Sequence, residues 1–209
     1  MQLRVLGPLD ITIDGRAVPL RSAKQRVLLA VLISAANAPV ASQRLIDALW
    51  DDPPPSAQEN LRLYVYHLRR ALEDGDRVVR HPSGYMLTIR PGELDAGLFE
   101  ELVAQGAQTL AAGDAGTASQ LLTRALSLWR GPAYGNLADH PAVLAAAGWL
   151  EESRLRATEL RIQADLALGR HDGLIGELTA LVSQHPTLER FRSQLMLCLH
   201  RATWPGISP

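Results

Sequence analysis

The sequence predicts a mostly α-helical chain with a small β component, in which a winged helix-turn-helix domain precedes an all-α domain. Three observations lead to this fold class. Apolar residues first alternate with other residues, as in strands, and then recur at helical spacing. The first ninety residues follow the order small sheet, three helices, hairpin, which is the winged helix-turn-helix plan. From Leu94 onward only amphipathic helices are indicated.

The N-terminal stretch LRVLGPLDITIDGRAVPL is expected to form short antiparallel strands. Leu9, Ile11 and Ile13 alternate with other residues, which is the period of a strand with one buried face. Asp14-Gly15 is a tight-hairpin dipeptide, because both turn positions require a positive φ. A small antiparallel sheet is therefore predicted here.

Three helices are expected next. Ser22 is expected to cap the first, over AKQRVLLAVLISAA, and Asn37-Ala38-Pro39 ends it. Ser42 is expected to cap a shorter second helix, QRLIDALW, and DDPPP cannot be helical. The third helix begins after Ser56 and runs to about Leu72.

A hairpin follows the third helix. The stretch RVVRHPSGYMLTIR has two strand-like runs around Pro82-Ser83-Gly84. Pro91-Gly92 marks a boundary, so the first domain is expected to span residues 1–90 and the second residues 93–202. The last residues, 203–209, are expected to form an irregular tail.

Amphipathic helices are predicted for the second domain, over Ala96–Ala112, Thr117–Trp129, His140–Gly169, Asp172–Gln184 and Leu188–Ala202. Two of these units resemble each other at an offset of 56 residues, which aligns Leu110 with Leu166, Gly113 with Gly169, and Leu122 with Leu178. Such self-similarity indicates stacked helix pairs. An irregular helical bundle is the alternative.

Composition narrows the class of protein. The apolar fraction of 47% and the charged fraction of 21% are typical of a globular protein. Cys198 is the only cysteine, so a disulfide framework is excluded. Its side chain is expected to lie in the core. The N-terminus lacks the pattern of a signal peptide, and the longest apolar run, Val27–Ile33, is too short to span a membrane. A soluble cytoplasmic protein without a membrane partner is expected.

Charge is distributed unevenly along the chain. Residues 1–90 hold 12 Lys/Arg and 9 Asp/Glu, a net charge of +3, whereas residues 91–209 hold 9 Lys/Arg and 13 Asp/Glu, a net charge of −4. A basic first part joined to an acidic second part suggests two tasks, with any nucleic-acid contact in the first.

The third predicted helix concentrates arginines on one side. Turning 100° per residue gathers four residues on a narrow buried arc: Leu61, Val65, Leu68 and Leu72. The opposite side carries a mixed set of residues: Glu59, Arg62, Leu63, Tyr66, His67, Arg69 and Arg70. Arginine can pair with guanine, a carboxylate with cytosine N4, and leucine with a thymine methyl group. A DNA groove is one interpretation, and a solvated or protein-binding face is the other.

The hairpin offers a second place for contact. A wing of this kind reaches the DNA backbone or minor groove beside the recognition helix. Arg80 and His81 lie near its tip, where either contact with DNA or plain solvation accounts for them.

The stretches AKQRVLLAVLISAANAPVASQRLIDALW, LRLYVYHLRRAL and SGYMLTI, followed by ALSLWRGPAYGNLAD and ESRLRATELRIQADLALGRHDG, resemble the SARP family. These actinobacterial antibiotic regulatory proteins join an OmpR-type winged helix, a two-component-type output domain, to a bacterial transcriptional activation domain of tetratricopeptide-like helices. The resemblance implies a DNA-binding activator. Members bind promoter direct repeats as two side-by-side protomers and recruit or remodel RNA polymerase holoenzyme at biosynthetic gene clusters.

The resemblance also assigns roles to residues. It makes Ser56–Leu72 the recognition helix, with Arg62, Tyr66, Arg69 and Arg70 on its DNA side and Glu59 and Leu63 as further readers. Arg21 and Lys24 lie at the start of the first helix, where the family often contacts phosphates, although solvation of a helix start also explains them. The family's last repeat continues past a sequence like LMLCLHRA, whereas TWPGISP follows here. The chain is expected to be a fragment of a longer regulator or a short member.

No enzyme is expected, and no cofactor. A GxxxxGK phosphate loop is absent, and the six histidines show no metal-ligand spacing. The competing function is a helical-repeat adaptor that binds proteins, with a winged domain that does not bind DNA. Trp129, Tyr134 and Trp149 line a partner surface in that interpretation, or else they pin the inserted loop to the helices.

Overall fold

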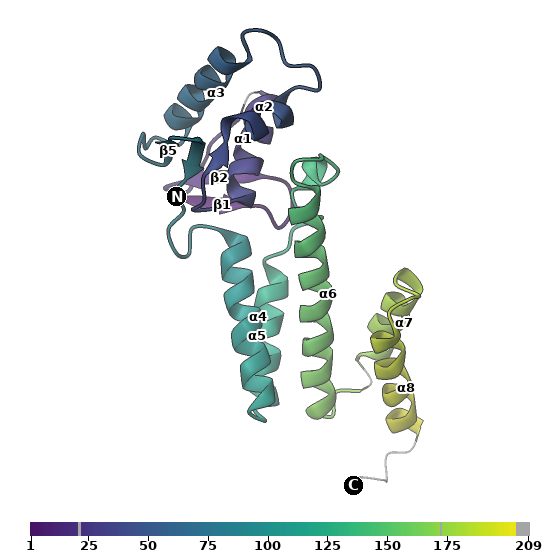
Figure 1. The fold of residues 1–209 in the computed structure, drawn as a ribbon. Helices are drawn as coiled ribbons and strands as arrows, with labels where there is room; N and C mark the ends of the chain where they lie inside the picture. Colours follow the sequence, from purple (N-terminus) through teal and green to yellow (C-terminus); the bar gives the residue numbers. More distant parts are fainter. Residues whose placement is uncertain (21, 172, 204–209) are drawn as a thin grey trace. The chain divides into compact units, whose positions relative to one another are not determined.

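The computed structural model describes residues 1–20, 22–171 and 173–203, and it has the predicted fold class of helices with small antiparallel sheets (Figure 1). Two compact units are distinguished. The first combines Met1–Leu98 with Trp129–Glu151, and the second combines Phe99–Leu128 with the chain from Glu152 onward. None of the helices in the part of the chain that the structure describes is long and apolar enough to cross a membrane.

The N-terminal sheet has the order β1-β2-β3, formed by Gln2–Arg4, Asp10–Ile13 and Arg16–Ala17. All pairs are antiparallel. Asp14 and Gly15 both have positive φ, 49° and 79°, as the predicted hairpin dipeptide requires. The predicted hairpin is confirmed.

Three helices and a second sheet complete the winged helix. The helices are α1 (Ala23–Ser34), α2 (Ser42–Leu49) and α3 (Ala57–Ala71). The second sheet has the order β4-β6-β5, formed by Val40–Ala41, Gly84–Leu87 and Val78–His81. The sequence did not predict β4, since two residues are too short to show a strand period.

The expected serine caps differ from the structure. Ala41, not Ser42, occupies the N-cap position of α2. The reason is the pairing of β4 with the hairpin, because the Ser42 N–H donates to Ser83 O at 2.9 Å. Ser22 and Ser56 do occupy N-cap positions, but neither side chain makes a capping hydrogen bond. The Ser56 hydroxyl instead accepts from Asn60 Nδ2 at 3.0 Å.

The core of the winged helix forms around α1. Every residue from Leu28 to Ile33 is buried, so this helix is covered on all sides. The predicted inner arc of α3 is confirmed, since Leu61, Val65, Leu68 and Leu72 are all buried. This arc leaves the opposite side of α3 to face outward.

The segment Trp129–Glu151 belongs to the first unit. The Tyr134 N–H donates to Val5 O and the Arg130 N–H donates to Leu6 O, both at 2.7 Å. Trp129 and Tyr134 are buried, whereas Trp149 is exposed. Backbone hydrogen bonds to Val5 and Leu6 therefore hold the inserted segment, and of the three predicted aromatic residues Trp149 lacks the burial that pinning requires.

Asp95 secures the same region. Its carboxylate accepts hydrogen bonds from the N–H groups of Val5, at 2.8 Å, and Leu6, at 3.1 Å. Burial raises the pKa of Asp95, and these two hydrogen bonds together with the charge of Arg130 oppose that rise without cancelling it.

The remaining helices agree with the prediction to within a few residues. They are α4 (Asp95–Ala111), α5 (Ala115–Ser127), α6 (Leu144–Ala167), α7 (Ile175–Gln184) and α8 (Glu189–Thr203), with a 3-10 turn at Gly135–Leu137. The predicted start of α6 at His140 is wrong by four residues, because turns occupy the chain up to Val143. Asp172, the predicted start of α7, and residues 204–209 of the expected tail lie outside the described residues, and Thr203 ends α8.

The repeat is visible in how α4 and α6 end. Gly113 and Gly169 have left-handed φ of 90° and 77°. The N–H that follows each glycine bonds a carbonyl five residues back, Asp114 to Thr109 at 3.1 Å and Arg170 to Asp165 at 3.0 Å. Both ends are Schellman motifs. The aligned Leu122 and Leu178 are fully buried. These features favour the repeat over the irregular bundle.

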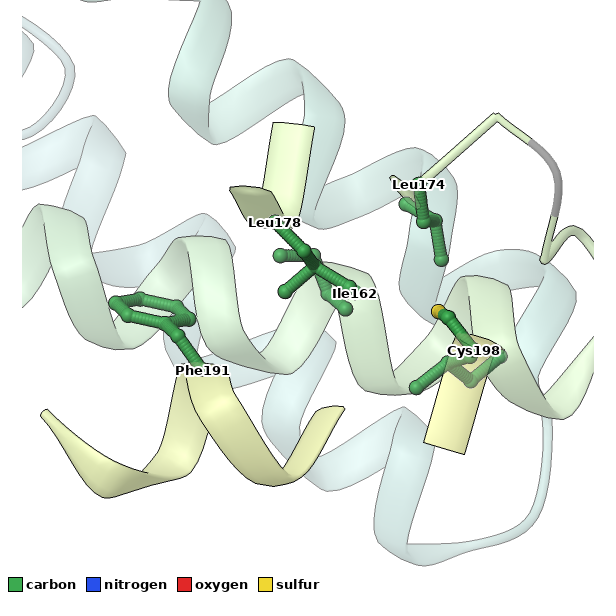
Figure 2. Close-up of a cluster of buried hydrophobic side chains, with 6 residues drawn as sticks. Ile162, Leu174, Leu178, Phe191 and Cys198 are labelled. Carbon is green, nitrogen blue, oxygen red and sulfur yellow. The ribbon is translucent and has the colours of Figure 1, made fainter. Parts of the chain in front are cut away.

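A hydrophobic cluster joins α6, α7 and α8, as Figure 2 shows. Its buried members are Ile162, Leu166, Leu174, Leu178, Phe191 and Cys198. The predicted core position of Cys198 is confirmed, since the side chain has no exposed surface.

Candidate nucleic-acid interface

The outward side of α3 exposes apolar and charged residues together. The exposed fractions of Leu63 and Tyr66 are 50% and 53%. Glu59, Arg62 and Arg70 are also exposed. These five residues follow helical spacing, so they form one face, here called the α3 face.

The arginines of the α3 face are available for a partner. The side chains of Arg62 and Arg70 make no hydrogen bond or ion pair with any residue that the structure describes. The Tyr66 and His67 rings lie 5.5 Å apart in an edge-on arrangement. Guanidinium groups beside a phenol and an apolar side chain suit base edges and phosphates.

Lys24 helps to hold α3 in place. Its Nζ donates to Leu49 O at 2.9 Å and lies 4.3 Å from the centre of the Trp50 ring. The Trp50 ring in turn lies 6.0 Å from the Tyr64 ring on α3. Lys24 thus links the start of α1 to the turn before α3, and its predicted phosphate contact stays a prediction. Arg21 lies outside the described residues.

Arg69 differs from its neighbour Arg70. Its Nε and Nη2 donate to Val78 O at 2.9 Å and 2.6 Å, and the residue is half-buried. This contact joins α3 to the first strand of the wing. The structure places the Arg69 side chain against the wing instead of on the α3 face, and its predicted DNA contact stays a prediction.

The tip of the wing carries the two predicted residues. Arg80 donates from Nη1 to the Tyr85 hydroxyl at 2.8 Å. His81 Nδ1 lies 2.8 Å from Ser83 Oγ, and both residues are exposed. Val79, whose exposed fraction is 39%, was missed by sequence reasoning, because its place on the edge strand β5 depends on the sheet order.

A buried arginine anchors the base of the wing. Arg77 donates to both carboxylate oxygens of Glu93, at 2.6 Å and 2.8 Å, and from Nε to Asp74 at 3.0 Å. Sequence reasoning missed this cluster, and the acids on either side of Arg77 were the signal. Its hydrogen bonds to Glu93 raise the pKa of the Arg77 guanidinium.

Glu93 responds in the opposite direction. Burial is the largest influence and by itself raises the pKa of this carboxyl. The hydrogen bonds from Arg77 and from the Arg90 N–H outweigh it, so the pKa of Glu93 lies below its usual value. The carboxylate is therefore a permanent partner for Arg77 at neutral pH.

Two family models match the chain. Residues 15–87 match "Transcriptional regulatory protein, C terminal", and residues 94–203 match "Bacterial transcriptional activator domain". The first covers the three helices and the wing, including the α3 face. The second covers the helical part.

Relatives match nearly the whole chain. The regulatory protein DnrI of Streptomyces peucetius is 35% identical over 97% of this chain and 78% of its own length. The transcriptional regulatory protein EmbR of Mycobacterium tuberculosis is 39% identical over 92% of this chain and 51% of its own. The structure of EmbR in complex with a low-affinity phosphopeptide has a TM-score of 0.91 and 36% identity, over 97% of this chain and 55% of that one. The chain thus spans about half the length of EmbR.

The fold, the α3 face and the matched models define a DNA-binding transcriptional regulator, a class without enzymatic activity. DNA binding by the winged domain also disfavours the adaptor interpretation, which required a winged domain that does not bind DNA. The chain belongs to the SARP family of regulators, which join an OmpR-type winged helix to a bacterial transcriptional activator domain.

Proposed function

We propose that this chain activates transcription by binding promoter DNA that carries direct repeats and by recruiting RNA polymerase holoenzyme. Two protomers bind side by side, one on each repeat. The regulated genes form a secondary-metabolite cluster, and the protein acts in the cytoplasm, at the nucleoid. Family membership supports the class of target. The observation that carries DNA binding is the α3 face, where exposed Arg62 and Arg70 without internal partners flank exposed Leu63 and Tyr66.

Each residue of the α3 face has a role in this proposal. Arg62 and Arg70 donate to guanine or to phosphate, and Glu59 accepts from cytosine N4. Leu63 contacts a thymine methyl group, while the Tyr66 hydroxyl donates to a phosphate. The exposed wing tip, with Arg80 and His81, follows the backbone beside the groove.

The two parts of the chain divide the work. Residues 1–90 bind DNA, and residues 93–202 support side-by-side assembly and contact polymerase. Separate family matches over residues 15–87 and 94–203 support this division. The uneven charge, basic in the first part and acidic in the second, agrees with it.

Selection from a random duplex pool tests the proposal. The whole chain should enrich fragments that hold two copies of one half-site in the same orientation. Fluorescence anisotropy on an enriched fragment should then show binding that weakens steeply as salt rises, because phosphate contacts release counterions. Enrichment of single or inverted sites contradicts the direct-repeat arrangement, and no enrichment contradicts specific DNA binding.

Transcription in vitro tests activation separately. Purified RNA polymerase holoenzyme should produce more transcript from a template with the enriched fragment upstream of a weak promoter when the chain is added. A template with a scrambled fragment is the control. Equal transcript from both templates, despite selective binding, contradicts polymerase recruitment.

A further inference from the structure

We propose that Arg69 is a positioning residue that fixes the wing against the recognition helix, and that it is not itself a DNA contact. This inference rests on the proposed DNA binding. It separates two neighbouring arginines that the sequence cannot tell apart. The Arg69 side chain is half-buried and bonds Val78, whereas the Arg70 side chain is exposed and makes no hydrogen bond or ion pair with the described residues.

The position of Val78 explains why it needs this arginine. In the sheet order β4-β6-β5, β5 is an edge strand. Arg77 O accepts from the Thr88 N–H at 2.8 Å, on the side of β6. Successive carbonyls of a strand point to opposite sides, so Val78 O points away from β6 and has no ladder partner. A carbonyl of this kind needs a donor from elsewhere in the fold.

Arg69 supplies that donor twice. Its Nε and Nη2 form the side of the guanidinium that pairs with two acceptors at once, and both lie within 2.9 Å of Val78 O. An arginine uses the same fork to pair with a guanine edge. The Arg69 edge that could pair with guanine is therefore occupied inside the protein, whereas the same edges of Arg62 and Arg70 are available to DNA.

The contact also lies where it controls the wing. Arg77 holds the base of β5 through Glu93, and Arg69 holds the next residue, Val78, to α3. Toward the tip, Arg80 bonds the Tyr85 hydroxyl within the wing, while β4 pairs with β6 and the Ser42 N–H donates to Ser83 O on the other side of the hairpin. Arg69 therefore ties the edge strand of the wing to α3, while β4 holds the opposite side of the hairpin.

The same substitution in two adjacent residues tests this. Glutamine places its side-chain amide on the carbon that carries Nε in arginine, so Arg69→Gln keeps one donor for Val78 O and loses the charge. Its affinity for the enriched fragment and the slope of log K against log salt should stay close to wild type. Arg70→Gln is the matched control, and it should lower the slope by about 0.9 for a lost phosphate contact, or lower selectivity if Arg70 reads a base. An equal loss of slope in Arg69→Gln overturns the inference.

Arg69→Ala removes the donor entirely. It should weaken binding by about tenfold if binding must then order the wing at a cost of about one hydrogen bond to a charged group, and the salt slope should stay unchanged because the phosphate contacts in the complex are the same. Hydrogen exchange in the free protein is the readout that does not depend on DNA. Amides of Val78–His81 and Gly84–Leu87 should exchange faster in Arg69→Ala, and those of α1 should not change.

Two results separate this inference from the proposed function. Wing exchange that is the same in Arg69→Ala and wild type overturns the positioning role, even if DNA binding is intact. Failure of the wild-type chain to select any DNA overturns the proposed function, while faster wing exchange in Arg69→Ala still supports the structural contact.

Discussion

The arginines of the α3 face and the arginine at the base of the wing differ in what surrounds them. The side chains of Arg62 and Arg70 are exposed and make no hydrogen bond or ion pair with the described residues. Arg77 is 6% exposed and has its guanidinium bonded to Glu93 and Asp74. The difference shows that the charge of an arginine does not reveal its task. Burial and internal partners decide whether it stabilises the fold or serves a partner.

Removing Arg77 should have the largest effect on stability. Arg77→Ala leaves Glu93 without its buried partner, which typically costs about 3–5 kcal/mol. The free energy of unfolding in urea measures this loss. Arg16→Ala, at an exposed position, is the control and should change it by less than about 0.5 kcal/mol. Similar losses in both variants would erase the distinction between the two classes of arginine.

Removing Arg62 or Arg70 should affect binding and leave stability unchanged. Alanine at either position should cost about 1–3 kcal/mol of binding free energy if the arginine reads a base. Anisotropy titrations measure this, with the enriched fragment and with a fragment in which one base pair is changed. An equal loss of affinity for every DNA sequence assigns the arginine to a phosphate contact. A loss of unfolding free energy that accompanies the loss of affinity would instead make the arginine structural.

Sequence reasoning predicted the parts of this comparison that depend on local pattern. The inner arc of α3 follows from apolar residues at helical spacing, and the outer face follows as its opposite. Gly113 and Gly169 were found because a repeated helix end repeats its residues. These features depend only on residues within a few helical turns of one another in the sequence.

The parts that sequence reasoning missed depend on distant contacts. Arg69 and Arg70 are adjacent and alike, and only the position of Val78 O separates them. The hydrogen bond from Tyr134 to Val5 joins residues far apart in the sequence, so nothing local indicated that the inserted segment belongs to the first unit. β4 exists because Gly84 lets the hairpin approach Val40 O, where a Cβ would overlap it.

Acid should act with opposite sign on two carboxyls near the base of the wing. The pKa of Glu93 lies below its ordinary value of 4.5, so its stabilisation is complete above pH 4.5 and is lost as the pH falls through the lower folded value. The pKa of Asp95 lies above its ordinary value of 3.8, so the cost of its burial is relieved as the pH falls. Wild type should therefore lose its advantage over Glu93→Gln on acidification and gain relative to Asp95→Asn.

Urea unfolding of wild type and both variants at a series of pH values measures these differences. For each variant, the difference in unfolding free energy between wild type and variant is plotted against pH. The two curves should slope in opposite directions. Curves of the same sign would mean that the internal hydrogen bonds of Glu93 do not outweigh its burial.

The smallest effect should come from an arginine that is paired but not buried. Arg4 lies 3.0 Å from Asp10, and the side chains are 36% and 35% exposed. If pairing alone made an arginine structural, Asp10→Asn would cost about as much as Arg77→Ala. Exposed pairs are screened by water and typically contribute about 0–1 kcal/mol, so a loss in that range is expected from urea unfolding. Such a result would place the boundary between the two classes at burial, because Arg4 and Arg77 both have carboxylate partners and differ chiefly in exposure.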